Sequence, residues 1–72
     1  MSKLPVVSGR KVIKALQHLG YEIRDQEGSH IHLRHLTRRP LTVPNHKEIA
    51  RGTLREIIRQ VELTVEKFIR LL

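Results

Sequence analysis

Apolar residues in the first third of the chain recur every three or four positions, which is the period of an amphipathic helix. The residues with this spacing are Val12, Ile13, Leu16 and Leu19. Ser8 precedes them as a suitable N-cap, and Gly20 follows them as a C-terminal stop. The pattern therefore predicts a first helix between Ser8 and Gly20.

The pattern then changes to an alternation of apolar and polar residues, which is typical of strands with one buried face. Three short runs show it, 21–25, 30–35 and 41–43, with turn-forming segments at 26–28 and 37–40 between them. Short connections between successive strands predict an antiparallel meander. The face that we expect to be buried carries Tyr21, Ile23, Ile31, Leu33, Leu41 and Val43.

Helical spacing returns in the last third of the chain, and its apolar residues are Leu54, Ile57, Ile58 and Val61. Two pairs nearby have the spacing of a capping box, Asn45 with Glu48 and Thr53 with Glu56. The second pair is the better signal because the apolar stripe follows it directly. Thr64 is expected to cap a short last helix, whose apolar side carries Phe68, Leu71 and Leu72.

The predicted order is helix, three strands, helix and a short C-terminal helix, which is an α+β fold in a single domain over residues 1–72. The apolar stripes are all buried if the helices cover one face of the sheet. The other face is left to solvent, and it carries His30, His32 and Arg34. We expect the chemistry of the protein on this open face.

Composition narrows the class of partner. The 72 residues include 14 Lys and Arg against 7 Asp and Glu, and the formal charge of +7 favours nucleic acid. Tyr21 and Phe68 are the only Phe, Tyr or Trp residues, too few for base stacking, so recognition is expected to use phosphate and sugar. The lack of cysteine excludes disulfides and thiolate metal sites. No apolar run could span a membrane and residues 1–5 lack a signal-peptide core, so we expect a cytoplasmic protein.

His30 is the main candidate for catalysis because it follows Gly28 and Ser29 at the start of the middle strand. A histidine titrates near neutral pH and can take the proton of a ribose 2′-hydroxyl, whose oxygen then attacks the adjacent phosphate. This reaction needs no metal and is confined to RNA. The cations expected to hold the phosphate oxygens are Arg34, Arg38 and Arg39. The simpler interpretation is that His30 is an exposed polar residue on a solvated strand.

A metal site is a second interpretation of the same region. His30, His32 and His35 form an H-x-H-x2-H set, and two histidines on one strand face can bind a metal. However, His35 should point to the other face, and we see no cysteine or well-placed carboxylate to complete the coordination. We therefore expect no metal and no other cofactor.

Five short motifs along the chain, taken together, resemble those of one protein family. They are Ser8-Gly9, Leu19-Gly20-Tyr21, Gly28-Ser29-His30, Val43-Pro44-x-His46 and Gly52-Thr53-Leu54. In this order, over about residues 3–72, the set resembles the HicA family, the toxin halves of HicA–HicB type II toxin–antitoxin pairs.

The resemblance implies a fold like that of the double-stranded RNA-binding domain, α-β-β-β-α, and an activity as an endoribonuclease that cleaves messenger RNA. The essential histidine of the family lies in the Gly-Ser-His motif, which maps to His30. The resemblance also implies a HicB-like antitoxin that covers the active surface in a hetero-oligomer. Family members often have a glycine between the last two helical segments, where this chain has residues 61–64, so the two helices could be continuous.

The resulting hypothesis is a metal-independent endoribonuclease toxin in which His30 is the general acid or base. The residues expected to contact the RNA are Gly28, Ser29, His32, Arg34, Arg38, Arg39 and Lys11. The alternative is a non-catalytic RNA-binding module of the same fold. The partner of His30 in proton transfer is open among His32, Arg34 and a basic residue of the turn.

Overall fold

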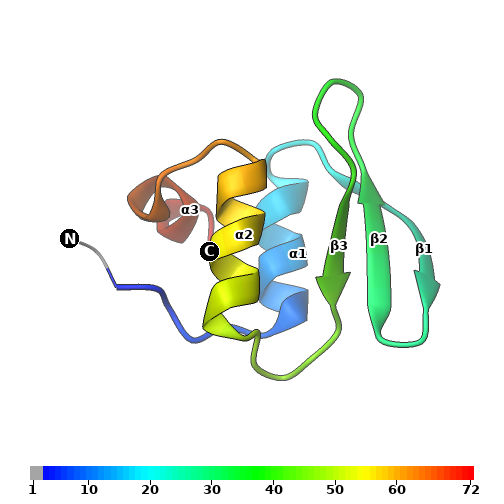
Figure 1. Cartoon of the computed structure of the whole chain (residues 1–72). Coiled ribbons are helices and arrows are strands. Elements are labelled where there is room, and N and C mark those ends of the chain that lie inside the picture. Colours follow the sequence, from blue (N-terminus) through cyan, green and yellow to red (C-terminus); the bar gives the residue numbers. More distant parts are fainter. Residues whose placement is uncertain (1–2) are drawn as a thin grey trace.

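The computed structural model describes residues 3–72 (Figure 1). Its elements are α1 (Gly9–Gln17), β1 (Glu22–Glu27), β2 (His30–Arg34), β3 (Leu41–Pro44), α2 (Arg51–Gln60) and α3 (Val65–Leu71). The strands form one antiparallel sheet in the order β1-β2-β3, and α1 and α2 both contact β3. This is the predicted α+β layout, which agrees with that of the double-stranded RNA-binding domain. Within residues 3–72, no helix is long and apolar enough to cross a membrane.

Two of the three helices begin at the predicted N-caps. The hydroxyl of Ser8 accepts a hydrogen bond from the backbone N–H of Lys11 at 3.2 Å, and α1 begins at the next residue. The hydroxyl of Thr64 accepts from the N–H of Lys67 at 3.1 Å in the same way before α3. Each bond satisfies one of the free N–H groups of a helix start.

The start of α2 was predicted wrongly. Its N-cap is Ala50, which offers no side-chain hydrogen bond, and Thr53 lies inside the first turn. Ile49, one residue earlier, is 3% exposed, and its N–H donates to the carbonyl of Val7 at 2.8 Å. The insertion of Ile49 into the core therefore determines where α2 begins, and neither capping-box pair is used.

The core draws its buried side chains from every helix and from β2 and β3, but β1 contributes none. Tyr21, just before β1, is buried as expected, whereas Ile23 is 51% exposed, so the prediction that Ile23 lies in the core is wrong. β1 is the edge strand farthest from the helices (Figure 1), which pack mainly over β3. A shift of strand register immediately after Ile23 also breaks the expected alternation.

α2 and α3 are separate helices joined by a bend at residues 61–64. Glu62 has a φ of 58°, in the left-handed region, and its N–H donates to the carbonyl of Arg59 at 3.0 Å. The next N–H, of Leu63, donates to the carbonyl of Ile58 at 3.2 Å. A glutamate thus makes a bend that suits glycine, at a conformational cost of about 1–2 kcal/mol.

Candidate active site

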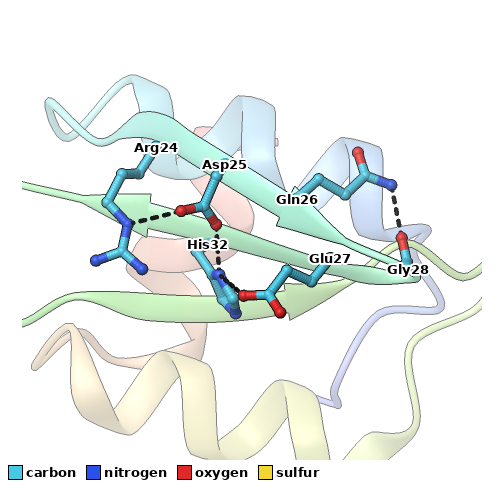
Figure 2. Close-up of polar contacts among 6 residues, drawn as sticks. All are labelled: Arg24, Asp25, Gln26, Glu27, Gly28 and His32. Atoms are coloured by element: carbon cyan, nitrogen blue, oxygen red, sulfur yellow. Dashed lines mark hydrogen bonds and ion pairs between the residues drawn. The ribbon is translucent and has the colours of Figure 1, made fainter.

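A tight turn joins β1 to β2 and presents His30 as the first residue of β2. Gly28 has a φ of 58°, a conformation that glycine adopts without strain. The side-chain amide of Gln26 donates to the carbonyl of Gly28 at 2.9 Å (Figure 2), which ties the turn to β1. Glycine is therefore favoured here by the backbone conformation.

The side chain of His30 lies on the open face of the sheet. Ile31 and Leu33 are 4% and 1% exposed on the helix side, and the alternation of β2 directs His30, His32 and Arg34 to the opposite side. The prediction that these three residues share the face left to solvent is confirmed. The ring of His30 makes no hydrogen bond within residues 3–72 and is exposed, so both of its nitrogens are accessible to a ligand.

Three segments meet at this end of the molecule (Figure 1). The N–H of Asn45 donates to the carbonyl of Ser29 at 2.6 Å, and the N–H of Gly9 donates to the carbonyl of His46 at 2.9 Å. Pro44, the β3 partner of His30 in the register, lies so close to Gly9 that an added Cβ would overlap the carbonyl oxygen of Pro44. The start of α1, the β1–β2 turn and the β3–α2 loop therefore support one another.

Lys11 is exposed in the first turn of α1 at this same end, on the helix side of the sheet. With Arg10 and Lys14 it lines a groove of ≈ 450 Å³, whose other wall includes Ile23 and Gln26 of β1. The groove is positively charged because these three basic side chains line it together with no acidic one. Lys11 is thus near the predicted catalytic turn but lies in a different layer.

Arg34 shares the open face with His30 but lies at the opposite end of β2. They are four positions apart, which is about 13 Å along a strand. The guanidinium of Arg34 is 3.6 Å from the carboxylate of Glu22, its partner across the sheet, and both side chains are exposed. The structure therefore does not bring Arg34 to the imidazole of His30.

Arg38 and Arg39 also lie at that far end, in the connection between β2 and β3. A guanidinium nitrogen of Arg38 donates to the carbonyl of Val61 at 2.7 Å, at the end of α2. The carbonyl of Arg39 accepts from the hydroxyl of Tyr21 at 2.9 Å, and burial raises the pKa of this phenol above its ordinary value. The backbone of the turn and the Arg38 side chain thus serve to hold the fold.

His35 has a structural role. Its Nε2–H donates to the carbonyl of Leu19 at 2.7 Å, and its Nδ1 accepts the backbone N–H groups of Thr37 and Arg38, each at 3.0 Å. This tautomer is assigned from the hydrogen-bond pattern. Because both ring nitrogens are engaged, the H-x-H-x2-H set does not assemble as a metal site.

Asp25 is a site residue that sequence reasoning missed. A β-bulge at Arg24 adds one residue to β1, so that Asp25 lies opposite His32 on the open face. Oδ1 of Asp25 is 2.6 Å from Nδ1 of His32, and Nε of Arg24 donates to Oδ2 at 3.1 Å (Figure 2). The hydrogen bond with His32 holds the pKa of the Asp25 carboxyl below its usual range, and Arg24 adds to this effect. The sequence signal was the loss of alternation over residues 24–27, which are all polar.

The family model for the HicA toxin of bacterial toxin–antitoxin pairs matches residues 9–63, about three quarters of the chain. The chain belongs to the HicA toxin family. A comparison with curated proteins gives no match. The matched range of this HicA-family toxin includes α1, the whole sheet and α2, and with them His30, His32 and Asp25. Membership of the family implies an antitoxin as its partner.

The open face of this HicA-family toxin is more acidic around His32 than the overall charge suggests. Glu27 is 80% exposed, and its Oε1 lies 3.9 Å from Nδ1 of His32 (Figure 2). Asp25, Glu27 and His32 offer three possible metal-ligand atoms within 4.8 Å of one another. The premise that no carboxylate lies near the strand histidines is therefore wrong, although exposed acidic groups of this kind are common without a metal.

Proposed function

We propose that this HicA-family toxin is a metal-independent endoribonuclease that cleaves messenger RNA, with His30 as general acid or base. The position of His30 supports the proposal. His30 is exposed on the open face at the start of β2, directly after Gly28 and Ser29, and its ring makes no hydrogen bond within residues 3–72. An imidazole in this setting can accept the proton of a ribose 2′-hydroxyl, which DNA lacks.

The RNA backbone is proposed to cross the sheet at the end that carries this turn. Gly28 and Ser29 shape the turn, and a phosphate there can reach the backbone or hydroxyl of Ser29. Lys11 supplies positive charge from α1, and His32 is the next side chain along the open face. These groups serve phosphate and sugar, in keeping with the lack of exposed aromatic rings.

The arginines at the far end of the sheet take a secondary role in this proposal. Arg34 and Arg39 are exposed there and would meet RNA beyond the scissile phosphate. Arg38 is bonded to the carbonyl of Val61 and would contribute charge more than direct contact. Their effect on binding should therefore be mainly electrostatic and sensitive to salt.

We also infer that the antitoxin is HicB-like, forms a hetero-oligomer with the toxin and covers the end of the sheet around His30. The toxin carries a formal charge of +7, so a complementary antitoxin surface would be acidic. The toxin would act in the cytoplasm, where messenger RNA is translated.

The test is induction of the wild type, His30→Ala and His18→Ala without antitoxin, with growth and total RNA followed together. His18 is the matched control, because it is an exposed histidine at the C-cap of α1. We expect arrest and RNA cleavage by the wild type and by His18→Ala, and neither by a folded His30→Ala. Purified wild type should cut RNA equally well with a chelator present. Equal toxicity of His30→Ala and the wild type, or RNA binding without cutting, would instead favour the non-catalytic RNA-binding module.

A further inference from the structure

The open face carries a second histidine in a different setting from His30. His32 follows it by two residues on the same side of β2, so their Cα atoms lie about 6–7 Å apart. The His32 side chain is 23% exposed, and its Nδ1 lies 2.6 Å from Oδ1 of Asp25. The imidazole of His30 therefore makes no hydrogen bond within residues 3–72, whereas the imidazole of His32 is held by Asp25.

Asp25 fixes both the tautomer and the direction of the His32 ring. An ionised carboxylate can only accept hydrogen bonds, so His32 donates through Nδ1–H. The other oxygen of Asp25 is held by Arg24 at 3.1 Å, which keeps the carboxylate in place (Figure 2). With Nδ1 directed at Asp25, Nε2 of His32 points away from the carboxylate and is the nitrogen available to a substrate.

The bulge at Arg24 is what creates this pair. In a regular ladder without the bulge, Asp25 would lie opposite Ile31 and share the helix side of β1 with Ile23. Bulges occur often beside active sites, where they redirect a side chain. A local distortion that places a carboxylate behind an imidazole is the arrangement by which enzymes orient a histidine for proton transfer.

We propose that His32 is the second proton-transfer group of RNA cleavage, with Asp25 as its positioning residue. This inference rests on the proposed ribonuclease function. His30 takes the proton of the 2′-hydroxyl, O2′ bonds to phosphorus and the bond from phosphorus to O5′ breaks. His32 gives the proton on Nε2 to O5′, and the carboxylate of Asp25 balances the charge of the imidazolium before the transfer. The products are a 2′,3′-cyclic phosphate and a 5′-hydroxyl, and solvent restores both protonation states.

The spacing of the two residues suits this reaction. In an in-line displacement the entering and leaving oxygens lie on opposite sides of phosphorus, so two histidines on one strand face with Cα atoms about 6–7 Å apart can flank one phosphate. A hollow of ≈ 280 Å³ beside His32, lined in part by Arg24 and Thr42, offers room for the leaving nucleotide. Arg34, the other candidate on this face, is paired with Glu22 and lies at the far end of β2 from His30.

The experiment treats an oligoribonucleotide with purified protein. Its sequence spans a position at which messenger RNA breaks in cells that express the wild type, and it is made in two forms. One is natural, and in the other sulfur replaces O5′ at the scissile bond. Sulfur leaves as a thiolate and needs no proton, so it removes the need for a general acid. We expect His32→Ala to be slower on the natural form by about 10²–10⁴-fold and to approach the wild-type rate on the sulfur form. His30→Ala should be slow on both forms, because O2′ still needs a base.

Asp25 is tested through the pH profile. Asp25→Asn should lower the rate on the natural form and shift the limb of the pH–rate curve that depends on the acid, and Asp25→Glu should recover most of the rate. On the sulfur form, Asp25→Asn should match the wild type. Glu22→Gln is the matched control, because it removes another β1 carboxylate that is paired across the same face, and it should leave both rates unchanged.

The role of His32 is overturned if His32→Ala cuts the natural form at the wild-type rate, or if it is slowed equally on both forms. Unfolding cannot imitate the expected result, because a variant that cuts the sulfur form must be folded. Failure of the ribonuclease proposal looks different: the wild type then leaves both forms intact, or yields no cyclic phosphate, and the inference about His32 falls with it.

Discussion

Replacing Gly9 by alanine should destabilise the protein because the new Cβ has no room. It would overlap the carbonyl oxygen of Pro44 and approach the Cα of Asn45 at 3.3 Å. Both neighbours are backbone, so neither can rotate away as a side chain would. Either α1 or the end of β3 must shift to accept the methyl group.

The magnitude follows from two opposing effects. Overpacking of this kind costs about 1–3 kcal/mol, and a rigid backbone neighbour favours the upper part of the range. Alanine recovers about 0.5–1 kcal/mol over glycine in a helix. The net loss for Gly9→Ala is therefore about 2 kcal/mol, which for a domain of this size lowers Tm by about 8–16 °C.

Gly52→Ala is the matched control, because Gly52 also lies in the first turn of a helix but has no atom within 4 Å of an added Cβ. It should gain up to about 1 kcal/mol. The assay is urea unfolding of both variants, followed by far-ultraviolet circular dichroism. If Gly9→Ala proves as stable as Gly52→Ala, the close approach of α1 to β3 is wrong.

Three further predictions test other parts of the structure. Leu16→Ala removes a side chain with no exposed surface, so urea unfolding should show a loss of about 2–5 kcal/mol; a loss under about 1 kcal/mol would place Leu16 outside the core. Glu62→Gly relieves a left-handed glutamate and should raise Tm, with a net gain of up to about 1 kcal/mol after the entropy of glycine is subtracted; a lower Tm would contradict the bend. The pKa of Asp25 is lowered in the folded chain, mainly by the hydrogen bond with His32, so the stability that this carboxylate contributes is present above the ordinary value of 3.8 and is lost as pH falls through the folded value. The difference in unfolding free energy between the wild type and Asp25→Asn should therefore shrink in acid. A difference that stays constant as pH falls below the folded pKa of Asp25 would count against the hydrogen bond between Asp25 and His32.

Features that depend on local chemistry were predictable from the sequence. The caps at Ser8 and Thr64 follow from a hydroxyl placed before an apolar stripe. The alternation of β2 placed Ile31 and Leu33 inside and left His30 outside, because each strand residue alternates in direction. The bend after α2 was left open because residues 61–64 lack the glycine that HicA-family members often have between the last two helices.

Features that depend on the rest of the fold were not predictable in the same way. α2 begins where the insertion of Ile49 into the core allows it, and a capping-box spacing at Thr53 could not reveal that. Ile23 is apolar and faces α1, but a groove separates it from that helix, so it stays half exposed. His30 could be named from a three-residue motif, whereas Asp25 could be named only once the register of β1 against β2 was known.

The bulge at Arg24 reverses the direction in which odd- and even-numbered residues of β1 point. Before it, odd-numbered Ile23 faces the helices; after it, odd-numbered Asp25 and Glu27 face outward, opposite His32 and His30. The effect is confined to β1, because β2 follows the turn at Gly28 and alternates regularly. The bulge thus changes which side chains of β1 share the open face with the histidines of β2. If the same residues paired in a regular ladder, Asp25 and Glu27 would turn to the helix side, and His32 would lose its carboxylate partner.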